Sequence, residues 1–334
     1  MTKKSARDPE IELLRVLLML GICIVHIINI GRAPGWVDSL TWLHGLVVCS
    51  VVGFVFISGY YGIRFSFAKL LRLYGVAFYC AFVSALIYTV CGHSVSDAWH
   101  AAYNQICNGW WFLHAYAVMM TMTPLVNVVF EIAERRRTLM ACSSVLFLVF
   151  AWSWIAVALD RQGLLFPMGR VFDSHSWLTL FGVYIAARLY RQWEVGEWFG
   201  WPLSVSVLLG VPFLIGFRSC VFGSYNAPHV LILTICIFSL FKRIRLGNTA
   251  GETMGRVLAF MTPSLFSVYL LHNGFCGKLL IAHYVEGGFA GTWYGMFVVI
   301  GVAIIIFSVS FVADAPRRIL AFLLRKVPCR RHAS

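Results

Sequence analysis

Two ionisable side chains, Arg15 and His26, interrupt the first long apolar segment of the chain. Nearly every other residue between Ile11 and Ile30 is apolar, and an ionisable group inside a membrane span costs a few kcal/mol to insert, so it is usually kept for function. Eleven residues at about 100° each complete almost a whole number of helical turns, so both side chains should share one face, about 16 Å apart. This geometry suits an elongated ligand with its anionic end at Arg15 and its reacting end at His26.

The chemistry available to each side chain follows from its environment. Burial disfavours the imidazolium form, and a neutral His26 ring can act as a general base toward a hydroxyl group. The alternative is a structural histidine that hydrogen-bonds a neighbouring helix. The Arg15 guanidinium matches the geometry of a phosphate. Alternatively, Arg15 extends to the membrane interface or pairs with Glu12, three residues earlier.

The composition indicates an integral membrane protein. The 334 residues are 60% hydrophobic and only 12% charged, and the mean hydropathy is +0.80. A soluble domain of this length would need far more charged surface. The first apolar segment is too long for the core of a signal peptide and lacks a small-residue cleavage site, so we expect a retained helix.

The apolar runs predict an all-α, polytopic transmembrane helix bundle of about ten spans. No separate soluble domain is evident, so residues 1–334 are expected to form one integral-membrane domain, with tails at 1–10 and 315–334. The expected spans are 11–31, 40–63, 71–91, 110–130, 138–159, 174–190, 198–217, 226–241, 262–283 and 292–313.

The formal net charge of +13 does not indicate a nucleic-acid partner. The lysines and arginines fall mainly in alternate inter-span segments, as the positive-inside rule requires. This alternation predicts that both termini are cytoplasmic.

The ten cysteines form no Cys-x-x-Cys pair and no Cys/His metal spacing. Most lie within apolar segments and are predicted to be small packing residues, so no metal site is expected. Cys91 and Cys107 flank one predicted outer loop. They could pair in an oxidising compartment, although packing roles are favoured there too.

Several motifs resemble the acyltransferase family 3 membrane proteins. The Arg-x10-His pair of the first span is followed by segments similar to family motifs, in the family's order. These segments are GFVFISGYYGIR (53–64), KLLR (69–72), GWWFLHAYAVMMTMTPLVN (109–127), SVYLLHN (267–273) and ADAPRRIL (313–320). Two departures are Lys69 in place of an arginine and Asp314 in place of a glutamate.

The resemblance implies transfer of an acyl group, usually acetyl, from cytoplasmic acetyl-CoA to a hydroxyl of a cell-surface or lipid-linked polysaccharide, in a bacterial plasma membrane. It implies that His26 is catalytic and that Arg15 contacts the donor. The basic residues Arg64, Lys69 and Arg72 suit the donor phosphates at the cytoplasmic face. Acyl-CoA is then a substrate, and no permanently bound cofactor is expected.

A second group of residues could line the path of the acceptor. Aromatic rings with a few polar groups suit stacking on sugars, although an interfacial aromatic belt explains them equally well. The group comprises Trp110, Trp111, His114, Tyr116, Tyr269 and His272.

A transporter or flippase of a glycan or anionic substrate is the main alternative. Transporters often contain internal repeats with matching Gly- or Pro-broken helices, and neither feature is found in this sequence. A purely structural membrane subunit would leave His26 and His272 unexplained. The acceptor, the size of the acyl group and the oligomeric state remain open at this point.

Overall fold

The computed structural model describes residues 8–30, 38–132, 134–152, 155, 175–194, 196, 198–217, 224–245, 248–274, 277–279, 281–282 and 294–326. Every regular element within these ranges is helical, which confirms the predicted all-α class. The α-helices are α1 (Pro9–Ile30), α2 (Asp38–Val47), α3 (Ser50–Tyr61), α4 (Phe67–Val90), α5 (Val95–Asn104), α6 (Trp111–Ile132), α7 (Arg135–Leu146), α9 (Trp177–Gln192), α10 (Trp201–Phe217), α12 (Pro228–Arg243), α13 (Asn248–Met261), α14 (Leu265–His272), α16 (Gly295–Ala313) and α17 (Ala315–Lys326). The π-helical segments η1 (Gln105–Gly109) and η2 (Phe147–Trp152) and the 3₁₀ turn η5 (Thr262–Ser264) complete the set.

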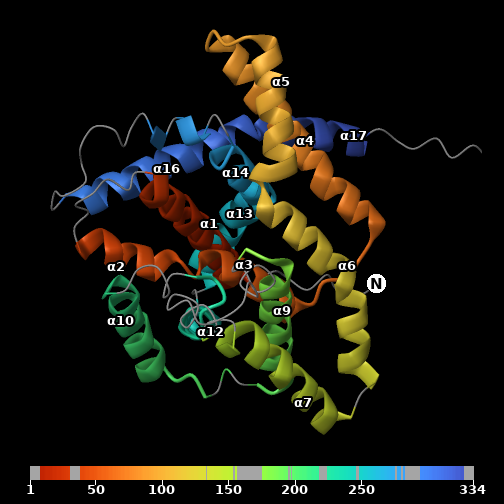
Figure 1. The fold of residues 1–334 in the computed structure, drawn as a ribbon, viewed down its shortest axis with the longest axis vertical. Coiled ribbons are helices and arrows are strands. Elements are labelled where there is room, and N and C mark those ends of the chain that lie inside the picture. Colours follow the sequence, from red (N-terminus) through yellow and green to blue (C-terminus); the bar gives the residue numbers. More distant parts are fainter. Residues whose placement is uncertain are drawn as a thin grey trace, which may run out of the picture.

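Helix α1 lies at the centre of the molecule (Figure 1). It packs against α2, α3, α12, α13, α14 and α16. Its apolar residues are buried on most of its circumference, for example Leu14, Cys23 and Ile27. A helix that is apolar all round belongs in the interior of a bundle. Arg15 and His26 are therefore carried by a central, largely enclosed helix.

The helix pair α3 and α9 forms the other wall beside α1. Gly59 of α3 allows this close approach, because a Cβ at that position would lie 2.7 Å from the Ala187 Cβ and 2.9 Å from the Tyr184 carbonyl oxygen. Gly62 then ends α3 in the left-handed region, at φ +79°. Only glycine adopts this conformation freely, so Gly62 sets the direction of the following turn.

Six helical segments among the described residues are long and apolar enough to cross a membrane. They are Pro9–Ile30, Leu40–Tyr61, Phe67–Val90, Trp111–Ile132, Gly251–His272 and Gly295–Leu323. All ten predicted segments contain helix, but α9, α10 and α12 have only 16, 17 and 16 residues. At about 1.5 Å per residue, these helices are shorter than a typical hydrocarbon core. The molecule is a multi-pass helical membrane protein, and the count of ten crossings stays a prediction.

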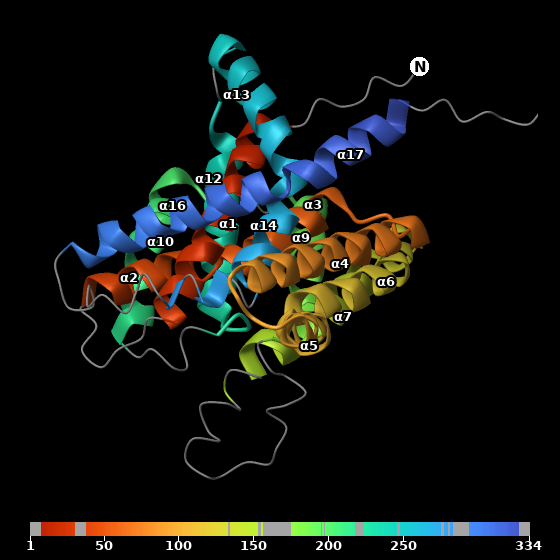
Figure 2. The ribbon, with the colours of Figure 1, turned by 90° about the horizontal axis from the view of Figure 1, so that it is seen from above.

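Part of the predicted span 262–283 lies outside the described residues. Within them, an apolar helical stretch runs over Gly251–His272, beginning in α13, passing through the 3₁₀ turn η5 and ending at His272. Its first half falls in the predicted loop 242–261, which contains Glu252 and Arg256. Both side chains are exposed, so they do not prevent an otherwise apolar helix. Figure 2 shows α13 projecting beyond the neighbouring helices.

Three smaller features also differ from the expectation. The predicted span 40–63 is divided into α2 and α3, and the predicted loop 92–109 contains α5 and η1. The predicted tail 315–334 begins with helix α17, which follows directly after α16 (Figure 2). Ile319 and Phe322 on α17 are exposed, beside several basic residues. An amphipathic helix of this composition is typical of a membrane interface.

Candidate active site

His26 and His272 contact each other across the α1–α14 interface. The His26 Nδ1 and His272 Nε2 atoms lie 2.8 Å apart, and the ring centroids are 4.9 Å apart. His272 is fully buried, whereas His26 is partly exposed. The structure therefore joins two residues that the sequence placed in different roles, one catalytic and one in the acceptor path.

A cavity of about 560 Å³ opens among α1, α3, α4, α6, α14 and α17. One part of its wall is strongly basic, and its described lining includes no carboxylate. The cations that line it are Arg15, Arg64, Lys69, Arg72 and Arg317. The four predicted donor-binding residues, which come from α1, the α3–α4 turn and α4, thus share one cavity.

The remainder of the cavity wall is apolar and extends toward the histidine pair. Met19 and Ile22 of α1 face Val51 of α3 and Phe112 of α6 across it. The α1 lining ends at Ile22, one helical turn and about 6 Å short of His26. His26 itself is not part of the lining.

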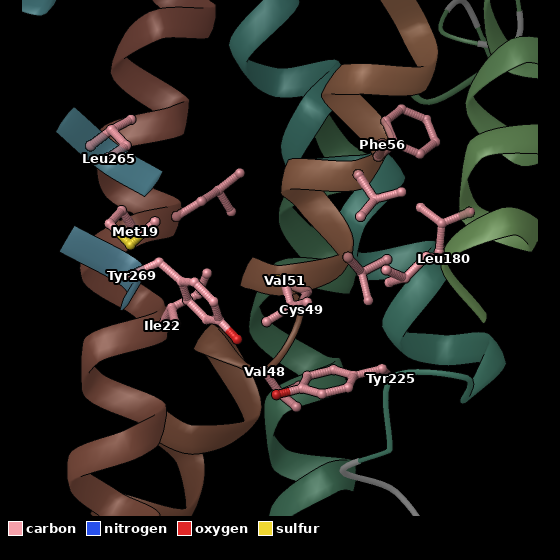
Figure 3. Close-up of a cluster of buried hydrophobic side chains, with 14 of the residues drawn as sticks. Met19, Ile22, Val48, Cys49, Val51, Phe56, Leu180, Tyr225, Leu265 and Tyr269 are labelled. Atoms are coloured by element: carbon pink, nitrogen blue, oxygen red, sulfur yellow. The ribbon is translucent and has the colours of Figure 1, made fainter. Parts of the chain in front are cut away.

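Tyr269 of α14 lies at this apolar end, three residues before His272. Figure 3 shows its ring beside Ile22 and Met19, with the hydroxyl directed away from α14. The ring also packs edge-on against Phe112. The hydroxyl is buried and makes no well-formed hydrogen bond to a described residue, although the Asn273 side chain and the Phe112 backbone lie close to it. Because an unsatisfied buried polar group costs about 1–3 kcal/mol, it marks a position where a ligand could accept a hydrogen bond.

Arg15 is paired and also lines the cavity. Its Nη1 lies 2.7 Å from Glu12 Oε1. Glu12 is buried, and its other carboxylate oxygen accepts a hydrogen bond of 2.6 Å from the Thr262 hydroxyl. The Glu12 pairing, one of the alternatives open for Arg15, is therefore present, and it is compatible with ligand contact because a guanidinium has five N–H donors.

A ring of hydrogen bonds fixes the turn that carries Arg64. The backbone N–H of Ile63 donates to the Tyr184 hydroxyl at 3.2 Å, and this hydroxyl donates to Asn127 Oδ1 at 2.9 Å. Asn127 Nδ2 in turn donates to the Ile63 carbonyl at 3.0 Å. Helices α6 and α9 thus hold the turn after Gly62 in place, and with it one edge of the cavity.

The cations on the α4 side are largely available. Lys69 Nζ donates to the Arg64 carbonyl oxygen at 2.6 Å. The side chains of Arg64 and Arg72 make no ion pair with any described residue. Both residues are exposed at the cavity opening. Unpaired guanidinium groups at an open site favour an anionic ligand.

Arg317 is a cavity residue that sequence reasoning missed. Asp314 is fully buried and binds it at both oxygens, with Nε–Oδ1 at 2.6 Å and Nη2–Oδ2 at 2.8 Å. Arg317 Nη2 also donates to the Pro263 carbonyl at 3.2 Å. An acid followed three residues later by an arginine, directly after the last span, is the signal that could have found this pair.

The predicted acceptor-path residues do not form one group. Trp110 is fully buried, and its Nε1 donates to the Leu270 carbonyl at 3.2 Å. His114 contacts the Ile106 carbonyl through Nε2 at 2.7 Å and the Tyr74 hydroxyl through Nδ1 at 3.2 Å.

Tyr116 and Trp111 point to different places. Tyr116 lines the basic cavity. Trp111 stacks on Tyr225 with ring centroids 5.7 Å apart and meets His175 edge-on at 4.7 Å. Trp111 thus packs with His175 and Tyr225, away from the basic cavity.

A second cavity of about 420 Å³ is lined by Tyr60, Arg191, Lys242 and Arg243, among others. Its cations are already engaged. Arg191 donates to the Tyr60 carbonyl at 3.0 Å, and Arg243 donates to the Gly196 carbonyl at 2.8 Å. Lys242 forms an ion pair of 3.0 Å with Asp8. The first cavity is therefore the better candidate for an anionic ligand.

Asp8 precedes α1 and connects it to two neighbouring helices, accepting hydrogen bonds from Tyr61 at 2.8 Å and from Lys242 at 3.0 Å. Partial burial by itself would raise the pKa of the Asp8 carboxyl group. The two hydrogen bonds and the Lys242 charge outweigh it and hold the pKa below its ordinary value.

No cluster of three or more potential metal ligands occurs among the described residues. Cys23, Cys49, Cys80, Cys142 and Cys236 are buried and free, in agreement with the predicted packing roles. Cys91 and Cys107 are exposed and free.

The fold and the cavity define a multi-pass membrane protein with a basic cavity whose apolar wall extends toward the His26–His272 pair. The chain belongs to acyltransferase family 3, whose family model, described as an acyltransferase domain, matches residues 8–313. This match confirms the resemblance noted from the motifs, and the protein is a membrane acyltransferase. No curated protein and no solved structure matches the chain.

Proposed function

We propose that this acyltransferase moves an acetyl group from cytoplasmic acetyl-CoA to a hydroxyl of a cell-surface or lipid-linked polysaccharide, in a bacterial plasma membrane. One observation carries the proposal: a single cavity has five cations at one end and apolar walls that extend toward His26 at the other. Its volume lies within the range of about 300–1,000 Å³ that is usual for ligand pockets.

The basic end suits the phosphates of coenzyme A. Arg64, Lys69 and Arg72 face the cavity from the α3–α4 side, and Arg15 and Arg317 face it from α1 and α17. Arginine binds phosphate through two parallel N–H donors, and lysine acts as a point charge. Five cations and no described carboxylate in the lining give the electrostatic balance that a polyanion requires.

The apolar end suits the pantetheine arm. This thin chain would pass between Ile22 and Phe112. It would carry the thioester toward His26, which lies one helical turn beyond Ile22 on α1. The Tyr269 hydroxyl, which makes no well-formed hydrogen bond to a described residue, would donate one to the thioester carbonyl oxygen. This bond strengthens as negative charge develops on that oxygen.

The reaction at His26 is an acyl transfer. The acceptor hydroxyl loses its proton to the neutral His26 ring, and its oxygen forms a bond to the thioester carbonyl carbon. The carbon–sulfur bond then breaks, and the imidazolium returns the proton to the departing thiolate. The acceptor would approach from the opposite end to coenzyme A, where the half-buried ring of Trp111 could stack on a sugar.

Acetyl transfer in isolated membranes tests this function. Membranes that contain the wild-type protein are incubated with acetyl-CoA labelled in the acetyl group, and label in the glycan fraction is counted against membranes without the protein. We expect protein-dependent labelling that excess free coenzyme A reduces. No labelling, together with loss of glycan export when the protein is removed, would instead support a transporter.

A further inference from the structure

We infer that His272 is a positioning residue that fixes the tautomer of His26, so that the Nε2 atom of His26 carries the free lone pair. The inference rests on the proposed function, because it assigns a base to that reaction. Two hydrogen bonds carry it, one between His272 and a backbone carbonyl and one between His272 and His26. Further hydrogen bonds hold the α14 backbone in place.

The first contact determines the protonation of His272. Its Nδ1 lies 2.8 Å from the Val268 carbonyl oxygen. A carbonyl oxygen can only accept a hydrogen bond, so Nδ1 must carry a hydrogen. In the neutral ring, Nε2 then has none and can only accept.

The second contact passes this constraint to His26. Its Nδ1 lies 2.8 Å from His272 Nε2. Because His272 Nε2 can only accept, His26 Nδ1 must donate and therefore carries a hydrogen. The neutral His26 ring is then unprotonated at Nε2, the atom that can take a proton from a hydroxyl.

The opposite arrangement is unfavourable. If His272 donated from Nε2 to His26, its Nδ1 lone pair would face the Val268 carbonyl oxygen at 2.8 Å. Two acceptors would then be in contact, and a buried carbonyl would lose its partner at a cost of about 1–3 kcal/mol. His272 is fully buried and does not line the cavity, so water cannot supply the missing hydrogen bond there.

The third set of contacts holds the α14 backbone in place. The buried Gln105 side chain donates from Nε2 to the Asn273 carbonyl at 3.0 Å. Trp110 Nε1 donates to the Leu270 carbonyl at 3.2 Å. These hydrogen bonds come from η1 and from the residue directly before α6. They hold the backbone on both sides of His272 and limit its movement relative to His26.

The geometry also excludes His272 from relaying the proton onward. The hydrogen on its Nδ1 points to a backbone carbonyl, which cannot pass a proton further. The proton from the acceptor therefore stays on His26 until it reaches the leaving thiolate. In this arrangement, His272 orients the base and stabilises the imidazolium through Nε2.

Two substitutions at His272 test the role. In His272→Gln, the side-chain oxygen can still accept from His26 Nδ1, whereas His272→Leu fills similar space without an acceptor. We expect His272→Leu to lower kcat by about 10- to 100-fold, the usual effect of removing a partner that orients a functional histidine, with an unchanged KM for acetyl-CoA. We expect His272→Gln to retain most of kcat.

Nitrogen NMR of histidine-labelled wild-type protein provides a second measurement that needs no variant activity. His26 is assigned by its loss in His26→Asn. We expect a protonated Nδ1 and an unprotonated Nε2 on His26, and the reverse assignment would overturn the inference. Wild-type kcat in a folded His272→Leu protein would also overturn it.

The outcomes distinguish the catalytic role of His26 from the positioning role of His272. If His26→Asn retained acetyl transfer, the proposed function of His26 would fail. If His26→Asn were inactive while His272→Leu and His272→Gln had equal, wild-type kcat, only the positioning role of His272 would fail.

Discussion

The two ends of the cavity are built differently. The basic end consists of long side chains, and Arg64, Lys69 and Arg72 are all exposed. Beyond the apolar end of the cavity, His272 is fully buried and His26 is partly buried, and the Val268 carbonyl fixes the orientation of the His272 ring. Exposed cations can adapt to a flexible polyanion, whereas a proton transfer needs a base held in one orientation.

This difference predicts different kinetic effects at the two ends. Changes near His26 should lower kcat with little effect on donor binding. Changes at the basic end should raise the KM for acetyl-CoA and affect kcat less.

The largest effect is expected from His26→Asn. Asparagine keeps a polar side chain of similar size but cannot take a proton. Because general base catalysis typically contributes about 10²- to 10⁴-fold, kcat should fall by that order while the KM for acetyl-CoA changes little. Initial rates of labelled acetyl transfer at saturating donor would measure this. Near-wild-type kcat in a well-expressed variant would contradict a catalytic His26.

Tyr269→Phe should lower kcat less than His26→Asn does. The variant keeps the ring that packs against Phe112 and removes only the hydroxyl. We expect kcat to fall by about tenfold or more, because a hydrogen-bond donor to the developing oxyanion is lost. The melting temperature should change little or rise, since the hydroxyl makes no well-formed hydrogen bond to a described residue. A lower melting temperature with unchanged kcat would indicate a structural role instead.

Arg317→Ala should raise the KM for acetyl-CoA by about three- to tenfold, as expected for loss of one charge-assisted contact. It should also lower the melting temperature, because the fully buried Asp314 loses its cation. The neighbour of Arg317 provides a matched control. Arg318 stacks on Phe260 at 4.1 Å from the ring centroid and does not line the cavity. Arg318→Ala should therefore leave KM unchanged, and equal effects of the two substitutions on KM would argue against Arg317 as a donor contact.

The smallest effect concerns stability at the start of α1. The pKa of Asp8 is lowered by its partners, so its ion pair stabilises the protein above the unfolded-state pKa of about 3.9 and is lost as the pH falls through the folded-state pKa. Both partners are substantially exposed, so the contribution should be below about 1 kcal/mol. Asp8→Asn should lower the melting temperature slightly at pH 7. The difference from wild type should vanish in acid, and a difference that persisted there would contradict the ion-pair account.

Much of the candidate site could be predicted from the sequence because its residues interrupt apolar patterns. Arg15 and His26 are conspicuous on α1, and Arg64, Lys69 and Arg72 follow directly after an apolar segment. The structure places these four cations in one cavity. The all-α class was likewise evident from the apolar runs.

The pairings between distant helices could not be predicted. The residue pattern within α1 or within α14 does not specify that His26 contacts His272. The two residues are 246 positions apart, and their contact depends on how the two helices pack. Arg317 was missed for a related reason. Its role depends on the buried Asp314 and on a carbonyl of η5, so it follows from tertiary packing rather than from local pattern. The apolar stretch over Gly251–His272 begins earlier than the predicted span, because hydropathy alone does not show which side of a helix its charges occupy.

The central claim is that one ligand extends from the basic end of the cavity to His26. A cryo-electron microscopy structure of the His26→Asn protein with bound acetyl-CoA would test it most directly, because this variant should bind the donor without consuming it. We predict density with phosphates at Lys69 and Arg72 and the thioester beside Tyr269, next to residue 26. Density for the donor in the second cavity, at Arg191 and Lys242, would contradict the account.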